Sequence, residues 1–300
     1  MAATSVMTTL VTDDPNNRPL IVIAGPTDSG KSNVAIELAE QYGGEIISAD
    51  SRTIYKYMDI GTAKPSTEDQ ARVPHWGLDI VEPGQAFSAA DFKRYAVEKI
   101  AEIRTRGHVP LLVGGTGLYV DAVLFDYRFG PAADPEQREK LEAMSLEALH
   151  IYCNQNNIPL PENSQNKRYV IRAIEQKGIS AKRSALPIEN AIIVGIATER
   201  EQLRERIRQR SEHLFEDGVV DEAKRLAGEY GWDSEAMTGN IYRLAHAYLD
   251  KKITLAEFKK RNETADWQLA KRQLTWLKRN AYIEWLPLDE VKNYIAQRLA

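Results

Sequence analysis

The sequence of 300 residues predicts an α/β fold, in which a parallel sheet is flanked by helices and interrupted by a smaller all-helical insertion. Short apolar runs alternate with helix-like stretches through the first 124 residues, and another apolar run returns at 191–197. A turn-rich stretch with short helical segments separates them at 125–188. We therefore expect a flexible tail of residues 1–18, a core of residues 19–124 and 189–300, and an insertion domain of residues 125–188.

The strands of the expected sheet are the apolar runs at 20–24, 45–49, 109–113 and 191–197. Each run is short and nearly continuous in apolar residues, which is typical of strands that helices cover on both faces. Because helical stretches lie between the runs, neighbouring strands are expected to be parallel.

The helices are predicted from apolar residues that recur every three or four positions. In the stretch 88–107 this face is formed by Phe92, Ala96, Ile100 and Ile103. Ser88, three residues before Asp91, marks a capped start, and Gly107 marks the stop. Further helices are expected over 31–42, 200–216, 219–230, 242–249 and 254–280.

The composition fits a globular protein, because 43% apolar residues are enough to bury one large core and one small core. No run approaches the ~20 apolar residues that cross a bilayer, and the start lacks the regions of a signal peptide. Cys153 is the single cysteine, which excludes an internal disulfide and a Cys-rich zinc site. We expect a cytoplasmic monomer that makes no contact with membranes.

The formal net charge of −4 argues against binding of nucleic acid by the chain as a whole, but the charge is unevenly distributed. Residues 254–280 hold seven Lys and Arg against three Asp and Glu, and a polyanion can dock on such a local excess. An apolar stripe of Leu269, Trp276 and Leu277 runs along the same helix, so Trp276 is expected to be packed rather than stacked on a base.

The segment GPTDSGKS, residues 25–32, matches the phosphate-binding pattern G-x-x-x-x-G-K-[ST] between an expected strand and an expected helix. Gly25 and Gly30 let backbone N–H groups turn toward phosphate oxygens. Lys31 adds a positive charge and Ser32 a hydroxyl for Mg²⁺. The expected core is therefore a P-loop NTPase-like sheet.

The loop does not by itself identify its ligand. Enzymes that split a nucleoside triphosphate normally place an acid at the end of a later apolar strand, where it fixes Mg²⁺. The run at 109–113 ends in glycines and Thr116 without an acid, and the only acid at such a strand end is Asp50. A diphosphate that leaves without attack at phosphorus needs fewer acids. From the residues alone, Asp50 is explained equally well as the cap of a turn.

Six stretches together resemble the bacterial tRNA dimethylallyltransferases (tRNA isopentenyltransferases). They are GPTDSGKSNVAIELA, GEIISADSRTIYKYMDIGTAKPS, FSAADFKRYA, PLLVGGTGLYVDAVL, RYVIRAIE and QLAKRQLTWLKR, and they run in family order from about residue 20 to residue 280. The segments MDIGTAKP and AKRQLTW are more specific than the phosphate loop, which many families share. The single cysteine leaves no zinc finger of the kind that eukaryotic members carry.

The resemblance implies transfer of a dimethylallyl group from dimethylallyl diphosphate to N6 of the adenine immediately 3′ of the anticodon in tRNA. The catalytic residues that it implies are Asp50 as general base, with Thr27, Thr116 and Lys31. The residues that it places on the diphosphate are Gly25, Pro26, Thr27, Asp28, Ser29, Gly30, Lys31 and Ser32, with Ser32 as the Mg²⁺ ligand. The residues that it places on the anticodon stem-loop are Asp50, Ser51, Arg52, Thr53, Thr116, Arg138, Lys167, Arg168, Arg172, Lys271, Arg272 and Gln273.

The chain also departs from the family pattern, at Asp28, Tyr169, Thr238, Ile241, and Asp266 with Trp267. Family members generally carry a small residue in place of Asp28. A carboxylate among phosphate-binding amides repels the ligand unless it points outward, so we expect Asp28 to weaken binding of the donor. Replacement of Asp28 by Ala is then expected to lower the KM for the donor.

Three other functions remain open at this point. A small-molecule kinase of the P-loop type would use the arginine-rich stretch REQLRERIRQRSEH as a lid and Asp50 as a base. A catalytically impaired RNA-binding relative is consistent with Asp28 and Thr238. An enzyme that prenylates free AMP or ATP would share the loop but would not need the basic insertion.

Overall fold

The structure, a computed structural model, describes residues 18–130, 134–178 and 182–299. The tail expected over residues 1–18 lies, apart from Arg18, outside the described residues. The chain divides into two compact units. Unit 1 contains the described residues up to Leu124 and from Pro187 onward, and unit 2 is Phe125–Leu186.

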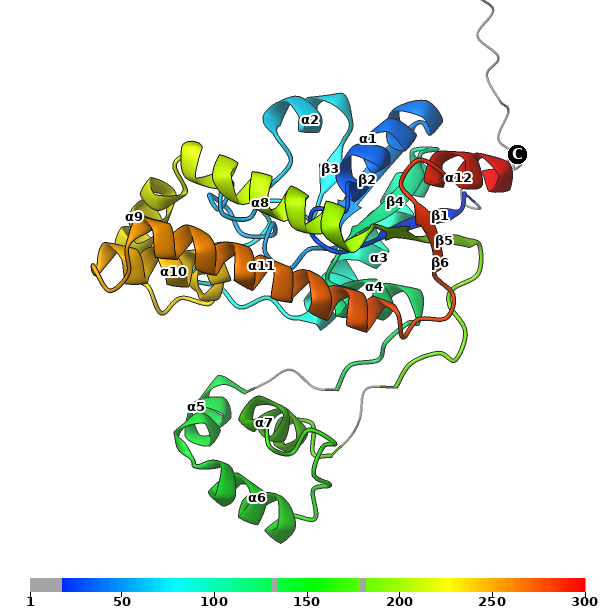
Figure 1. The fold of residues 1–300 in the computed structure, drawn as a ribbon. Helices are drawn as coiled ribbons and strands as arrows, with labels where there is room; N and C mark the ends of the chain where they lie inside the picture. The colour runs from blue at the N-terminus through cyan, green and yellow to red at the C-terminus, as the bar shows by residue number, and fades with distance from the viewer. Residues whose placement is uncertain (1–17, 131–133, 179–181, 300) are drawn as a thin grey trace, which may run out of the picture. The chain divides into compact units, whose positions relative to one another are not determined.

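The core of unit 1 is a single parallel sheet (Figure 1). Its strands are β1 (Leu20–Ala24), β2 (Gly44–Ser48), β3 (His75–Trp76), β4 (Val109–Gly114), β5 (Ala191–Ala197) and β6 (Glu284–Pro287). Their order in the sheet is β3-β2-β4-β1-β5-β6, and every neighbouring pair is parallel. The predicted α/β fold is confirmed, and the four predicted strands form its centre.

The helices of unit 1 lie on both faces of this sheet and beyond one of its ends. They are α1 (Lys31–Tyr42), α2 (Thr67–Arg72), α3 (Ala89–Thr105), α4 (Gly117–Leu124), α8 (Arg200–Glu216), α9 (Val219–Tyr230), α10 (Asn240–Leu249), α11 (Leu255–Leu277) and α12 (Val291–Leu299), with a 3₁₀ turn at Ala236–Thr238. Helices α1 and α12 lie on one face, and α3 and α4 on the other (Figure 1). Helices α2, α4 and α12 and strands β3 and β6 were not predicted from the sequence.

The ends of α3 illustrate why the local sequence predicts its helix well. The Ser88 hydroxyl accepts the N–H of Asp91, and the Asp91 carboxylate accepts the N–H of Ser88, which forms a capping box. Gly107 follows the helix with φ of 77°, a left-handed conformation that glycine adopts without strain. The four residues of the predicted apolar face are buried.

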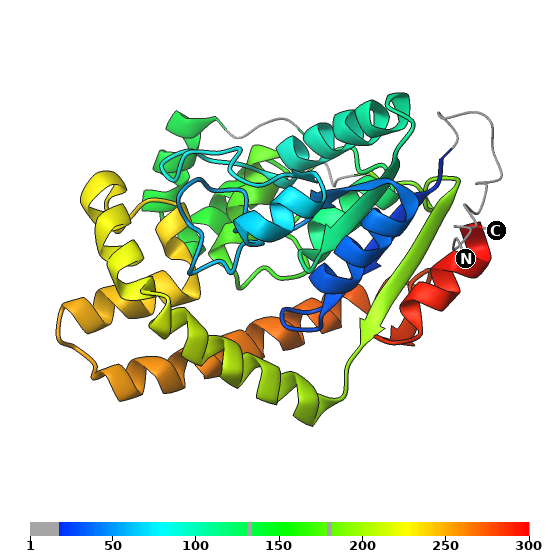
Figure 2. The ribbon, with the colours of Figure 1, turned by 90° about the horizontal axis from the view of Figure 1, so that it is seen from above.

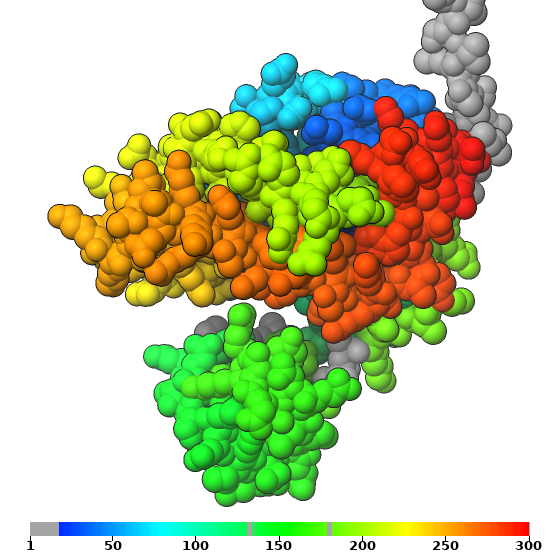
Figure 3. All heavy atoms as spheres, in the orientation of Figure 1, coloured from blue at the N-terminus to red at the C-terminus, as the bar shows by residue number. Residues whose placement is uncertain are grey.

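Helices α8 to α11 build a second layer beyond the end of the sheet toward which β5 points (Figure 2). Helices α8 and α11 pack together through Leu203, Ile207 and Ala270. Figure 3 shows the side chains of α8 directly against those of α11. The carboxyl ends of parallel strands are where α/β folds bind ligands, so this second layer meets the sheet at the expected place for a site.

A buried carboxylate, Glu45, lies near the amino end of β2. Glu45 is 2% exposed and accepts hydrogen bonds from the Trp76 indole (2.6 Å), the Arg106 guanidinium (2.8 and 2.9 Å) and, at 2.6 Å, the His108 ring. Although burial raises the pKa of Glu45, these hydrogen bonds more than offset it and hold the pKa at about 2.

Unit 2 consists of α5 (Pro135–Ala143), α6 (Leu146–Gln155) and α7 (Lys167–Glu175) around a small apolar core. Cys153 is fully buried in that core with Leu149 and Val170, so its role is packing. None of the helices in the described part of the chain combines the length and apolar character needed to span a membrane.

Candidate active site

The phosphate-binding loop, residues 25–32, joins β1 to α1 through two residues in left-handed backbone, Asp28 (φ 62°) and Gly30 (φ 90°). At Gly30 a Cβ would also lie 2.8 Å from the Leu288 side chain, so glycine is required there. The Lys31 ammonium folds back to donate to the Pro26 carbonyl at 3.1 Å. No side chain caps the start of α1, which leaves the N–H groups of its first turn for an anion.

Two helices from the C-terminal part of the chain hold this loop in place. The Thr27 N–H donates to the Gln273 side chain of α11 at 2.8 Å. From α8, Arg206 donates to the Ser29 carbonyl at 3.0 Å, and Arg210 donates to the Thr27 hydroxyl. The loop is therefore supported by groups that lie about 180 to 250 residues away in the sequence.

Arg210 also pairs with the Asp28 carboxylate, with the guanidinium 3.2 Å from Oδ2. The repulsion expected from Asp28 is therefore offset within the protein itself. Arg206 and Arg210 are not among the site residues predicted from the sequence, and the arginine-rich stretch that contains them was expected to act only as the lid of a kinase. Their spacing of four residues, which places both on one helix face, is the signal that could have identified them.

Asp50 lies two residues after β2, in a turn that is closed by hydrogen bonds. Its Oδ1 accepts the Arg52 N–H at 2.8 Å, so Asp50 does cap the turn. The Thr116 hydroxyl, from the end of β4, accepts the Ser51 N–H at 3.1 Å. These two bonds fix the positions of Asp50 and Thr116 next to each other.

The loop and the turn line one cavity of about 470 Å³ at the carboxyl ends of the strands. The predicted site residues that line it are Thr27, Asp28, Gly30, Lys31, Ser32, Asp50, Ser51, Arg52, Thr53, Thr116, Arg272 and Gln273. Those of unit 1 that do not line it are Gly25, Pro26, Ser29 and Lys271. Ser29 is fully buried behind the loop, and Lys271 is exposed.

Three acids line the cavity, Asp28, Asp50 and Asp266. The strand β4 ends without an acid, as predicted, and no cluster of three His, Cys, Asp or Glu that could hold a metal occurs among the described residues. Burial lowers the pKa of Lys31, as does Arg210 nearby, while Asp50 and Asp28 oppose this shift. Lys31 is therefore a desolvated cation that an anionic ligand would stabilise.

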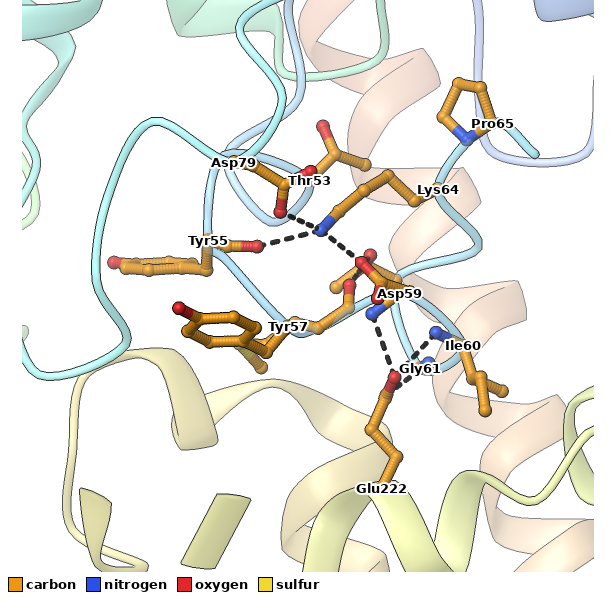
Figure 4. A network of polar contacts seen from close by, with 12 residues as sticks. Thr53, Tyr55, Tyr57, Asp59, Ile60, Gly61, Lys64, Pro65, Asp79 and Glu222 are labelled. Atoms are coloured by element: carbon orange, nitrogen blue, oxygen red, sulfur yellow. Dashed lines mark hydrogen bonds and ion pairs between the residues drawn. The ribbon is translucent and has the colours of Figure 1, made fainter. Parts of the chain in front are cut away.

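The segment MDIGTAKP forms a wall of the same cavity through Gly61, Thr62, Ala63 and Pro65. Glu222 reaches from α9 to this segment (Figure 4). Its carboxylate accepts the N–H groups of Asp59, Ile60 and Gly61, each at 2.8 Å, and the Tyr242 hydroxyl at 2.8 Å.

Lys64 fixes the other end of this segment. Its ammonium donates to Asp59, to Asp79 and to the Tyr55 carbonyl at 2.6, 2.7 and 2.9 Å, and its side chain is only 3% exposed (Figure 4). The hydrogen bonds of Glu222 and Lys64 thus fix the backbone of the MDIGTAKP segment, the same segment that is specific to the family in sequence.

Two of the departures from the family pattern lie beside the Asp50 turn. The Thr238 hydroxyl accepts a hydrogen bond from Arg52 at 3.3 Å. Ile241 lines the cavity next to Tyr242. Trp276 packs against Gly117, and its indole donates to Asp121 at 2.7 Å, so the expectation that it is packed is confirmed.

The predicted tRNA-contacting residues of unit 2 fall into two pairs. Arg138 and Arg172 both donate to Glu175, at 3.1 Å each, and the Glu175 side chain is 1% exposed. Lys167 donates to the Glu142 carbonyl at 2.6 Å, and Arg168 is exposed. The first pair therefore neutralises a buried charge inside unit 2.

Comparisons with known proteins agree on one family. The family model described as IPP transferase matches residues 53–280, and the model described as Isopentenyl transferase matches residues 19–79. A tRNA dimethylallyltransferase of Shouchella clausii is 40% identical over 286 residues, which cover 91% of this chain and 92% of that protein. One of Bacillus velezensis is 37% identical over 283 residues, which cover 89% and 90%.

Solved structures agree with this result. The crystal structure of the full-length tRNA isopentenylpyrophosphate transferase from Bacillus halodurans is similar to this chain with a TM-score of 0.72 at 36% identity, covering 94% of this chain and 97% of that one. The fold, the motifs along the chain and these similarities lead to one conclusion. The chain belongs to the IPP transferase family.

Proposed function

We propose that this chain is a tRNA dimethylallyltransferase, which moves the dimethylallyl group of dimethylallyl diphosphate onto N6 of the adenine immediately 3′ of the anticodon and releases diphosphate. The observation that carries the proposal is a single cavity lined by both the phosphate-binding loop and the Asp50 carboxylate. Relatives of the same family that match nearly the whole chain bear this name.

The loop is suited to a diphosphate that leaves rather than to a phosphate that is attacked. When the carbon–oxygen bond of the donor breaks, negative charge grows on the bridging oxygen of the diphosphate. The uncapped start of α1 and the Lys31 ammonium stabilise that charge, and they do so more strongly because Lys31 is shielded from water. No acid at the end of β4 is required for such a step.

The acceptor end needs a base, because the amine of adenine is a weak nucleophile whose lone pair is delocalised into the ring. The hydrogen bond from the Arg52 N–H orients the Asp50 carboxylate and leaves its second oxygen for a proton. As the new carbon–nitrogen bond forms, N6 gives its proton to Asp50, and the electrons of the broken carbon–oxygen bond leave with the diphosphate. An adenine inside the anticodon stack must first be flipped out to reach this group.

The cavity also fits Mg²⁺, which takes oxygen ligands and is often held by one or two protein groups together with the phosphates of the substrate. Ser32 offers an exposed hydroxyl that lines the cavity beside Lys31. When bound, the ion would neutralise charge on the diphosphate. Ser32 is the residue that we assign to it.

We assign contact with the anticodon stem-loop to Arg168 and Lys167 in unit 2 and to Arg272 and Lys271 on α11. Arg168, Arg272 and Lys271 are exposed, whereas Lys167 is half-buried and donates to the Glu142 carbonyl. Arg138 and Arg172 are instead assigned to the interior charge balance of unit 2, because both hold Glu175. We also propose that the enzyme acts as a monomer.

The test is transfer of radiolabel from dimethylallyl diphosphate to unmodified tRNA, with AMP and ATP as separate acceptors. Asp50→Asn is expected to slow the transfer by about 10²-fold to 10⁴-fold while tRNA binding is retained. Asp233→Asn, an exposed acid outside the cavity, serves as the matched control. Label that enters AMP or ATP but not tRNA would contradict the proposal, and equal rates for Asp50→Asn and wild type would remove Asp50 from the chemistry.

A further inference from the structure

Arg210 lines the cavity together with two carboxylates, Asp28 and Asp266, that the reaction described above does not use. Its guanidinium is 3.2 and 3.3 Å from the two oxygens of Asp28, and the side chains of Arg210 and Asp28 are 23% and 12% exposed. Asp266 of α11 is 9% exposed, accepts a hydrogen bond from Asn262 at 3.3 Å and interacts electrostatically with Arg210. Asp28, Arg210 and Asp266 line the same cavity as the phosphate-binding loop, and we call them the Arg210 cluster.

The arginine still has capacity for a ligand. Its Nε atom is buried and has no hydrogen-bond partner in the described part of the chain. A buried N–H without a partner costs about 1–3 kcal/mol, so an arriving oxygen atom would relieve it. Arg210 can therefore bind a further anion, although the carboxylate of Asp28 is already paired with it.

The Arg210 cluster opposes a diphosphate while both of its carboxylates stay ionised. The cluster carries one net negative charge, because it holds two carboxylates and one cation, whereas the cavity as a whole is lined by four cations, Lys31, Arg52, Arg210 and Arg272, and three carboxylates. Arg272, also on α11, lines the cavity at an exposed position. A diphosphate would bring at least two more negative charges into this space. Binding of the diphosphate to Arg210 is therefore favoured when one carboxylate of the cluster moves away or becomes neutral.

We propose that Asp28 occupies Arg210 when the donor is absent, that the diphosphate takes its place, and that Asp266 takes up a proton as this happens. The proposal rests on the proposed function for the nature of the donor. It makes Asp28 and Asp266 positioning residues, because both act on the diphosphate through Arg210.

The electrostatics of Asp266 fit the proton uptake. Burial raises the pKa of Asp266 to about 6, and Asp28 pushes it in the same direction, while Arg210 and the hydrogen bond from Asn262 oppose them. A diphosphate on Arg210 would add negative charge and draw away the cation that favours ionised Asp266. Both effects raise the pKa further, so near neutral pH the bound state carries more protons than the free state.

The test measures binding of inorganic diphosphate at fixed Mg²⁺ by calorimetry near pH 6.5, in two buffers with different ionisation enthalpies. Wild type is expected to take up roughly half a proton more than Asp266→Asn, since that variant has no carboxyl group to protonate. Asp28→Asn, which keeps a residue that tolerates left-handed backbone, is expected to bind diphosphate about tenfold more tightly.

Asp233→Asn is again the control, and Asp266→Ser replaces Asp266→Asn if the latter does not fold. Equal affinity in Asp28→Asn and wild type, or weaker affinity, would overturn the displacement of Asp28. Equal proton uptake in wild type and both Asp266 variants would overturn the role of Asp266. Because these measurements use neither tRNA nor prenyl transfer, a failed transfer assay would count against the proposed function and leave this inference to be judged on binding alone.

Discussion

Glu222 is expected to be the residue on which the MDIGTAKP segment depends, and the substitution Glu222→Gln tests this. The carboxylate is 6% exposed and accepts four hydrogen bonds, two at each oxygen. An amide keeps one acceptor oxygen and turns an NH₂ group toward donors. If the amide oxygen faces the N–H groups of Asp59 and Ile60, the Gly61 N–H loses its partner, whereas the Tyr242 hydroxyl can rotate and accept.

The magnitude follows from these contacts. An unpaired buried N–H costs about 1–3 kcal/mol, and each remaining hydrogen bond loses about 1 kcal/mol when its acceptor is no longer charged. Relief from burying a charge offsets part of this loss, so the free energy of unfolding is expected to fall by about 3 kcal/mol. Tyr242→Phe removes one of the four bonds and is expected to cost about 1 kcal/mol. Burial, reinforced by Glu222, raises the pKa of Tyr242, so in wild type the phenol remains a donor.

The measurement is the urea midpoint of both variants, together with the KM for the donor, since the segment lines the cavity. We expect Glu222→Gln to lower the midpoint more than Tyr242→Phe and to raise the KM. If Glu222→Gln unfolds at the wild-type midpoint, or if Tyr242→Phe is the more harmful change, the carboxylate does not organise this wall.

Three further predictions concern other contacts. Because the pKa of Glu45 is lowered in the folded state, the stabilisation that this carboxylate gives is present above pH 4.5 and is lost as the pH falls toward 2. In Glu45→Gln the free energy of unfolding should therefore fall by about 3 kcal/mol at pH 7 and should depend less on pH in the acid range; an unchanged acid dependence would contradict this. Gln273→Glu keeps an oxygen that accepts the Thr27 N–H but adds a negative charge, so the KM for the donor should rise about tenfold while the urea midpoint stays unchanged. An unchanged KM would show that the donor does not approach residue 273. Arg168→Ala should reduce the slope of log affinity for tRNA against log salt concentration by about 1. Arg138→Ala should instead mainly destabilise unit 2, because the buried Glu175 loses a partner, and the reverse pattern would assign Arg138 to the RNA.

The sequence predicted the parts of the fold that depend on local patterns. The β1 strand and α1 were predicted with the bounds that the structure has, because an apolar run, a glycine-bracketed turn and a periodic helix are all encoded within 25 residues of one another. The β2 strand was placed one residue too late, at 45–49 instead of Gly44–Ser48. Gly44 belongs to it because it pairs with Val109 of β4, and a Cβ there would lie 2.4 Å from Leu111. Both constraints come from the neighbouring strand, so the local pattern does not contain them.

The sequence predicted the individual segments of the candidate site, but not the contacts between segments that lie far apart in the chain. At the end of its strand, Asp50 was open between the cap of a turn and a base, and only the resemblance made it a base. The loop could be found from its pattern alone. The contacts of the loop with Arg210 and Gln273 could not, because they join residues that are 183 and 246 positions apart and are determined by how α8 and α11 pack. The same reason explains why Asp28 was expected to face a ligand and is in fact paired.

The long separation between the loop and its supports also determines when a nascent chain acquires its binding site. Thr27 leaves the ribosome 246 residues before Gln273, an interval of about 12 to 50 s at common rates of synthesis. During that interval the loop has its strand and helix but lacks the side chains of α8 and α11 that hold it. Affinity for diphosphate is thus acquired near the end of synthesis, and a chain interrupted before α11 would carry the complete phosphate-binding motif without the site that the motif serves.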